Sequence, residues 1–176
     1  AAPVRCAWKI TATSDTRPPE AVNVIAPVTH PANSDFEKDL SQWRALKAKY
    51  PATIARWEDD PARGRWCLRV LNPRVGGSFQ CMAVSTPYDA STLPVLSFSY
   101  KITKDVDVDL SCLVNGMRKY IKFADENSGV RYTGQVPDVV QDGKWHRASF
   151  NLRDMLIRND PYAAAYKVER IEFADH

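Results

Sequence analysis

Residues 93–116, LPVLSFSYKITKDVDVDLSCLVNG, contain two runs in which apolar and polar residues alternate. Alternation with a period of two indicates strands of a sheet that buries one face. Asp107 and Asp109 fall on the opposite phase of the second run, where we expect solvent. The apolar positions of the two runs are Leu96, Phe98, Tyr100 and Ile102, then Val106, Val108, Leu110, Cys112 and Val114.

Segments on both sides of this stretch predict further strands. They are CAWKITAT (6–13), GRWCLRVLN (64–72), SFQCMAVS (78–85), RKYIKFA (118–124), KWHRASFNL (144–152) and KVERIEFAD (167–175). The loop PRVGG at 73–77 predicts a hairpin between the second and third of these. RDMLIRNDPY (153–162) predicts one late helical turn, closed by Pro161. At least seven short strands without βα alternation indicate an all-β, two-sheet antiparallel sandwich.

The same alternation predicts which side chains form the core. We expect Leu68, Val70, Leu96, Phe98, Tyr100, Val108, Leu110, Cys112, Phe150, Leu152, Ile171 and Phe173 to face the interior. Cys112 is interpreted as a small buried hydrophobe.

The first 34 residues differ in composition from the rest. Five of the twelve prolines lie here, and each interrupts regular structure. We interpret residues 1–34 as an extended segment, a linker and the tail of a preceding domain, and residues 35–176 as the sandwich domain. The start, AAPVRCAWKI, lacks the order of a signal peptide, so we expect it to follow a processing site or to continue a longer protein.

Residues 35–49 allow two interpretations. Ser34 and Glu37 have the spacing of a capping box, and Phe36, Leu40 and Trp43 recur at helical spacing. This local pattern favours a helix that ends before Pro51.

Composition argues against several classes of function. The 24 Lys and Arg against 21 Asp and Glu give a charge of +3 that is interspersed, so we expect no nucleic-acid partner. No apolar run approaches the ~20 residues of a membrane-spanning helix, so we expect no membrane insertion. The four cysteines lack the spacing of a zinc site. A disulfide between Cys67 and Cys81 is left open.

Recognisable catalytic motifs are also missing from the sequence. It has three histidines, of which His146 follows Trp145, and no nucleophile elbow, zinc-protease motif or phosphate loop. Pairs of carboxylates can cleave glycosides, but the acids at 105–109 alternate on a predicted exposed face. We therefore expect a protein that is not an enzyme.

Five stretches in this order resemble the jelly-roll sandwiches of the galactose-binding-like superfamily, which includes many carbohydrate-binding modules. They are DFEKDLSQW (35–43), GRWCLRVLN (64–72), LPVLSFSYKI (93–102), DGKWHRASFNL (142–152) and VERIEFAD (168–175). The phrase DGKWH is also similar to laminin-G and concanavalin-like lectin domains. The resemblance implies a strand or extended entry at 34–38, with Phe36–Glu37 beside Ile171–Phe173 and at most a helical turn before Trp43.

The resemblance further implies a structural Ca²⁺ near the first strand, an early loop and the last strand. Calcium takes six to eight oxygen ligands. The acids available for it are Glu37, Asp59, Asp60, Glu172 and Asp175. The alternative is that these are ordinary surface acids.

A glycan site is the second implication, built on aromatic rings that stack on sugars. The candidates are Trp43, Trp57, Trp66, Tyr88 and Tyr132, each of which could instead belong to the core. We therefore expect a non-catalytic carbohydrate-binding module. The alternatives are a structural or protein-interaction spacer and, third, a polysaccharide-acting enzyme.

The compartment is suggested by VIAPVTHP at 24–31, which resembles inter-domain junctions of large bacterial secreted proteins. It implies an extracytoplasmic location (secreted, periplasmic or cell surface), with neighbouring domains as partners.

Overall fold

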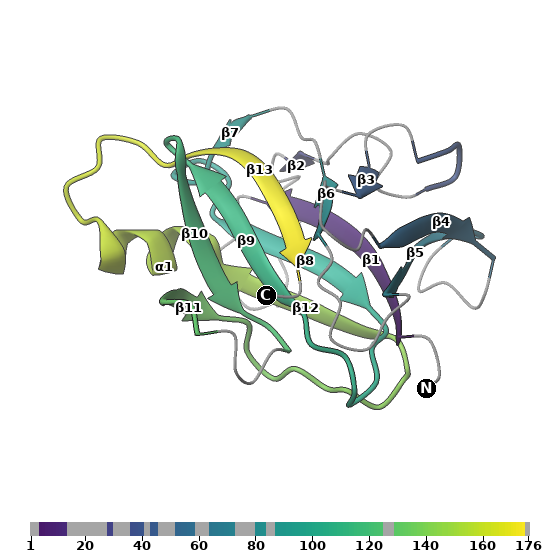
Figure 1. Cartoon of the computed structure of the whole chain (residues 1–176). Coiled ribbons are helices and arrows are strands. Elements are labelled where there is room, and N and C mark those ends of the chain that lie inside the picture. Colours follow the sequence, from purple (N-terminus) through teal and green to yellow (C-terminus); the bar gives the residue numbers. More distant parts are fainter. Residues whose placement is uncertain are drawn as a thin grey trace, which may run out of the picture.

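The alternating stretch at 93–116 forms two strands that lie in different sheets. Strand β8 (Val95–Tyr100) belongs to one sheet, called sheet A here, and β9 (Asp109–Val114) to the other, called sheet B. The computed structural model describes residues 4–13, 28–29, 36–40, 43–45, 52–58, 64–72, 80–83, 87–124 and 129–174. These residues contain thirteen strands and one helix (Figure 1).

Sheet A is antiparallel throughout its described pairs. Its order is β12 (His146–Asn151), β8, β1 (Val4–Thr13), β5 (Cys67–Asn72) and β4 (Thr53–Trp57), with β2 (Val28–Thr29) on β1.

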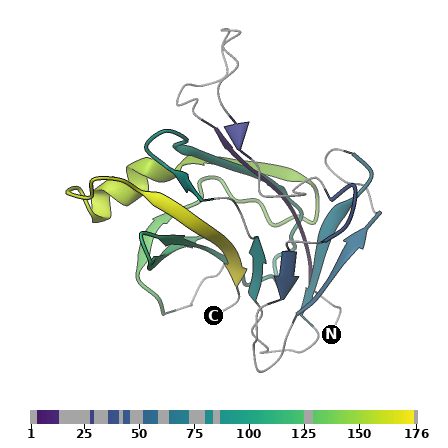
Figure 2. The same cartoon turned by 90° about the horizontal axis from the view of Figure 1, so that it is seen from above.

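Sheet B is also antiparallel, except that β10 and β11 run parallel. Its order is β11 (Tyr132–Gln135), β10 (Met117–Lys122), β9, β13 (Lys167–Ala174), β6 (Gln80–Ala83) and β3 (Trp43–Ala45), with β7 (Tyr88–Asp89) on β13. Figure 1 looks onto this sheet, and Figure 2 shows the two sheets from above. The prediction of an all-β protein with antiparallel sheets is confirmed.

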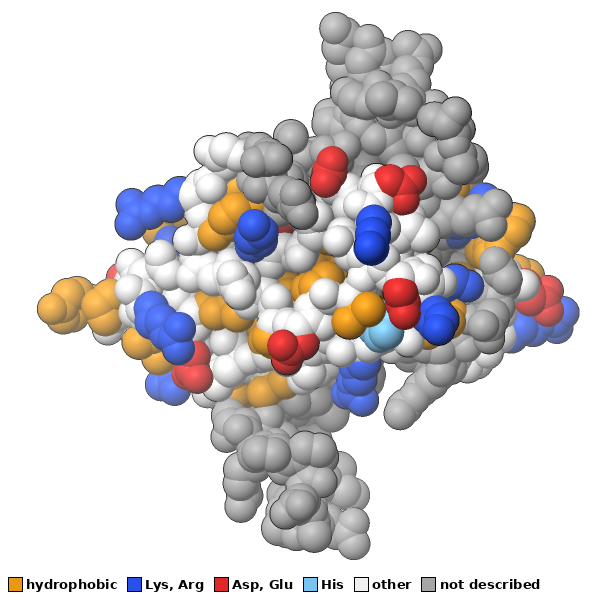
Figure 3. Space-filling view, turned by 90° about the horizontal axis from the view of Figure 1, so that it is seen from below, with side chains coloured by type: hydrophobic (Ala, Val, Ile, Leu, Met, Phe, Trp, Pro, Cys, Tyr) orange, Lys and Arg blue, Asp and Glu red, His pale blue; other side chains and the backbone are white. Residues whose placement is uncertain are grey.

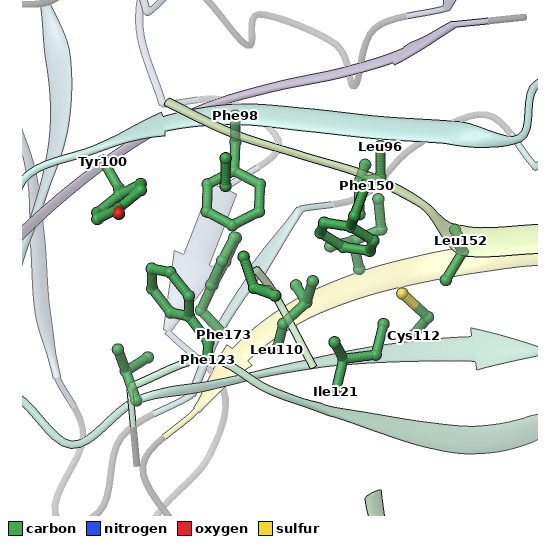
Figure 4. Close-up of a cluster of buried hydrophobic side chains, with 14 of the residues drawn as sticks. Leu96, Phe98, Tyr100, Leu110, Cys112, Ile121, Phe123, Phe150, Leu152 and Phe173 are labelled. Atoms are coloured by element: carbon green, nitrogen blue, oxygen red, sulfur yellow. The ribbon is translucent and has the colours of Figure 1, made fainter. Parts of the chain in front are cut away.

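The core lies between the two sheets and is centred on Phe98 (Figure 4). The Phe98 ring on sheet A meets Phe123 and Phe173 edge to face, each at a centroid distance of 5.4 Å. Such T-shaped pairs add to the free energy gained by burying the rings. All twelve predicted core residues are buried, so the prediction of the buried faces is confirmed.

The tight turn between β9 and β10 follows from Asn115 and Gly116. Both have positive φ, 50° and 75°, as the two-residue turns that match strand twist require. The Asn115 side chain also accepts the Lys167 N–H at 3.0 Å and donates to the Ala165 carbonyl at 2.7 Å. One residue therefore closes the hairpin and holds the start of β13.

The late helical turn is confirmed as α1 (Leu152–Asn159). Asn151 caps it, because its Oδ1 accepts the Asp154 N–H at 3.1 Å. No helix of the described residues has the length and apolar composition needed to cross a membrane.

The predicted hairpin between the segments at 64–72 and 78–85 is wrong. Strand β5 pairs with β1 and β4 in sheet A, whereas β6 pairs with β13 and β3 in sheet B. Both strands are real, but they belong to different sheets. Cys67 is buried, and its Sγ donates to the Trp57 carbonyl at 3.3 Å.

Strand β1 comes from the segment that we interpreted as a linker. It lies between β8 and β5 and pairs with both. Its first half pairs with β5, where Val4 lies opposite Asn72. Its second half pairs with β8, where Trp8 lies opposite Tyr100. These partners lie far along the chain, and alternation within 6–13 carries no sign of them. The sandwich therefore includes a strand from before residue 34.

Residues 36–40 form neither a helix nor a strand, and Trp43–Ala45 form β3, so the helix that the local pattern favoured before Pro51 is wrong. The resemblance implied a strand or an extended entry at 34–38, and the described part of that segment is not a strand. Phe36 has φ of 59°, in the left-handed region, which neither a helix nor a strand adopts. Its ring packs on Trp43 at a centroid distance of 5.3 Å, and both are buried. Strand β13, which we expected beside Phe36–Glu37, instead pairs with β9 and β6.

Candidate functional site

The five predicted sugar-binding aromatics differ in their access to solvent. Trp43 is only 3% exposed and packs on Phe36. Burial raises the pKa of the Tyr88 hydroxyl, which has no hydrogen-bond partner among the described residues. Trp66 and Tyr132 are half-buried, while Trp57 is 39% exposed. Trp57 is thus the most accessible of the five.

Trp57 and Trp66 lie at the same end of the β4–β5 ribbon but on opposite faces of it. Trp57 pairs with Cys67 in the antiparallel register, so the next residue back, Trp66, points the other way. Trp66 packs against the core, whereas the Trp57 ring is covered by the guanidinium of Arg69, whose central carbon lies 3.9 Å from the ring centroid. The two indoles therefore do not form one continuous platform.

Trp66 belongs to a network that holds the chain around residue 36. Arg56 lies 4.2 Å from the Trp66 centroid and donates to the carbonyls of Phe36 and Glu37, each at 2.7 Å. Arg65 lies 5.6 Å from the same centroid and pairs with Glu58 at 2.5 Å. These contacts give Trp66 a structural role.

Tyr132 is tied to a buried carboxylate on sheet B. Its hydroxyl donates to Asp109 Oδ2, while Asp109 Oδ1 accepts the Phe123 N–H at 2.9 Å. Asp109 is fully buried, which corrects the expectation that it faces solvent. Asp109 falls on the phase opposite to Leu110 and Cys112, but its carboxylate is buried there by groups that include Tyr132, to which it is bonded.

Glu172 is also buried on sheet B, beneath two arginines that sequence reasoning did not single out. Its Oε2 lies 2.9 Å from Arg118 Nη2, and its Oε1 lies 2.5 Å from Arg170 Nε. Ser111 donates to Oε2 at 3.3 Å. The available signal was that Arg118, Arg170 and Glu172 all fall on the phase opposite to the core residues of their strands.

The two predicted calcium ligands that the structure describes already have partners. Glu37 Oε1 accepts the N–H groups of Arg65 and Trp66, at 2.8 and 3.2 Å, and Glu172 is paired with two arginines. Asp59, Asp60 and Asp175 lie outside the described residues. Within the described part of the chain, no three His, Cys, Asp or Glu residues are grouped as a metal site.

His146 pairs with an acid four residues before it in the sequence. Its Nε2 lies 2.8 Å from Asp142 Oδ1, which also accepts the Lys144 N–H at 2.9 Å. These bonds lower the pKa of Asp142. The ring also lies beside Tyr100, whose hydroxyl accepts the Val140 N–H. Figure 3 shows the end of the molecule at the bottom of Figure 1, where acidic and basic side chains are interspersed.

No protein-family model and no curated protein matches this chain. The placement of Trp57 and of the sheet B arginines is therefore the basis for a functional proposal.

Proposed function

We propose that this chain is a non-catalytic binding module that holds a carbohydrate against Trp57. The observation that carries the proposal is the exposed indole of Trp57 with Arg69 stacked on it. A guanidinium covers one face of the ring at most, and more than a third of the residue stays accessible. A sugar offers a largely apolar ring face with a rim of hydroxyls, which suits an indole next to hydrogen-bond donors.

The finer fold proposal is a jelly roll of the galactose-binding-like kind. The strand order supports it, because successive segments of the chain alternate between sheets: β8 in A, β9 to β11 in B, β12 in A and β13 in B. Repeated crossing between two antiparallel sheets is typical of that architecture. In keeping with the resemblance, we propose that the module works beside other domains of a larger extracytoplasmic protein.

The test is glycan binding by the wild type and by a matched pair of variants. Binding to a glycan array or to insoluble polysaccharides is expected to be weak, about micromolar to millimolar. Trp57→Ala should abolish it, with tryptophan fluorescence as a second readout for the wild type. Tyr162→Ala removes another exposed aromatic, 95% accessible, and should leave binding unchanged.

Three results would overturn this proposal. If a broad glycan panel shows no binding, the structural or protein-interaction spacer becomes the better function. If the glycan binds equally well to Trp57→Ala, the sugar site lies elsewhere. Turnover of a polysaccharide that is lost in His146→Ala would favour the enzyme instead.

A further inference from the structure

The face of sheet B turned away from sheet A carries an excess of arginine over one buried carboxylate. Arg118 on β10 and Arg170 on β13 both pair with Leu113, one from each side. They therefore flank Leu113 on one face of three adjacent strands, which Figure 1 shows side by side in front of β8 and β12. Both reach Glu172, two residues beyond Arg170 on β13.

Glu172 satisfies only part of the hydrogen-bonding capacity of these arginines. Two guanidinium groups offer about ten N–H donors, whereas one carboxylate has about four acceptor sites. Ser111 uses one of those sites. Glu172 is 1% exposed, whereas about a third of each arginine side chain, 31% and 32%, remains accessible to solvent, although Arg170 Nε itself is buried.

The charge of this cluster is also unbalanced. Arg118, Arg170 and Glu172 sum to one positive charge. Asp109 on the same face is buried and bonded to Tyr132 and the Phe123 N–H, and Glu169 lies 3.6 Å from Lys167 Nζ. Arg44 adds a further positive charge on this face. It pairs with Met82, which in turn pairs with Glu172, so the three positions form one row across β3, β6 and β13.

A buried carboxylate under two arginines is not explained by stability. Burying such charges costs about as much as their attraction returns, so well-packed apolar residues would serve the fold equally well. What Glu172 does achieve is to fix two guanidinium groups, whose long side chains are otherwise mobile, in one orientation. Fixing donors before the ligand arrives reduces the entropy lost on binding.

We propose that Arg118 and Arg170 form a receptor for an oxyanion carried by a glycan, either a uronate carboxylate or a sulfate ester. The planar fork of a guanidinium group can donate two parallel hydrogen bonds to two oxygens of such an anion. Tyr120 lies two residues from Arg118 on the same face and pairs with Ser111, so the sugar ring next to the anion has an aromatic neighbour. This inference rests on the proposed carbohydrate function but uses a site separate from Trp57.

The test compares three tetrasaccharides by calorimetry: a galacturonic acid tetramer, a sulfated galactose tetramer and a neutral galactose tetramer. One or both charged tetramers should bind, with affinity that falls as sodium chloride rises. Arg118→Gln and Arg170→Gln should each weaken that binding at least about tenfold, since hydrogen bonds to charged groups are strong. Arg147→Gln, an exposed arginine on sheet A, makes the same charge change and should have no effect.

Whichever charged tetramer binds identifies the anion. If a glutamine variant does not fold, Arg118→Lys keeps the charge beside Glu172 but lacks the fork. It should weaken binding several-fold at an unchanged melting temperature. The inference is overturned if the charged tetramers bind no better than the neutral one, or if the glutamine variants bind them as tightly as the wild type. If the binding of a neutral glycan is lost in Trp57→Ala but retained in Arg118→Gln, the proposed function holds and only the inference about the arginines fails.

Discussion

Glu37 Oε1 accepts the backbone N–H of Arg65 at 2.8 Å, across 28 positions of sequence. The same oxygen accepts the Trp66 N–H, so one carboxylate joins the chain around residue 36 to the start of β5. Gly64 makes this approach feasible. Its φ is 78°, and a Cβ there would overlap the Glu37 carboxylate.

Gly64→Ala should therefore destabilise the fold more than Gly116→Ala. Both glycines have positive φ, so each substitution should cost about 1–2 kcal/mol in backbone strain. Only at Gly64 must Glu37 also move, which removes two hydrogen bonds worth about 1 kcal/mol each. Urea denaturation gives both values. Equal costs would show that the Glu37 bonds contribute little.

Phe98→Ala should lower the free energy of unfolding by about 3–5 kcal/mol, because it leaves a cavity between the sheets. The rings of Phe123 and Phe173 lose their shared edge-to-face partner. Tyr162→Ala, on an exposed loop, should change stability by less than about 0.5 kcal/mol. A loss under about 1 kcal/mol for Phe98→Ala would contradict the packing described here.

The pKa of Asp142 should lie below its ordinary value of 3.8, chiefly because His146 donates to it. A lowered pKa means that the ionised form is favoured by folding. The resulting stability is present above the ordinary value and is lost as the pH falls through the lowered pKa.

Carboxyl NMR titration measures this directly. In His146→Ala the pKa of Asp142 should rise towards 3.8. The pKa of Asp105, lowered by the Thr103 hydroxyl, should stay where it is. An Asp142 pKa that is the same in both proteins would exclude His146 as the cause.

Calcium binding stays a prediction that a thermal melt can test. If Ca²⁺ binds near Glu37 and the loop holding Asp59 and Asp60, millimolar calcium should raise the melting temperature by mass action. The rise should exceed that with magnesium and should vanish when both aspartates are changed to asparagine. Identical melts in chelator and in calcium would remove the hypothesis.

Local pattern predicted eight of the thirteen described strands and the core positions on the central ones, but it did not predict β2, β3, β4, β7 and β11. Apolar residues alternate with polar ones at Leu96, Phe98 and Tyr100, and again at Leu110 and Cys112. Such a strand is stable when its apolar face is buried, so these core positions could be predicted one by one. The helix α1 followed from the same kind of local signal. The sequence therefore determined the all-β class, in which short-range periodicity and turn residues suffice.

Only the tertiary structure decided which strands are neighbours. Strand β1 finds β5 and β8, and β5 and β6 part into different sheets, through contacts between residues far apart in sequence. The same holds for the polar groups. Asp109 and Glu172 lie on the phase away from the core, yet Tyr132, Arg118 and Arg170 bury and pair them. Side-chain exposure depends on these distant partners, so the sequence alone could not separate an accessible Trp57 from a buried Trp43.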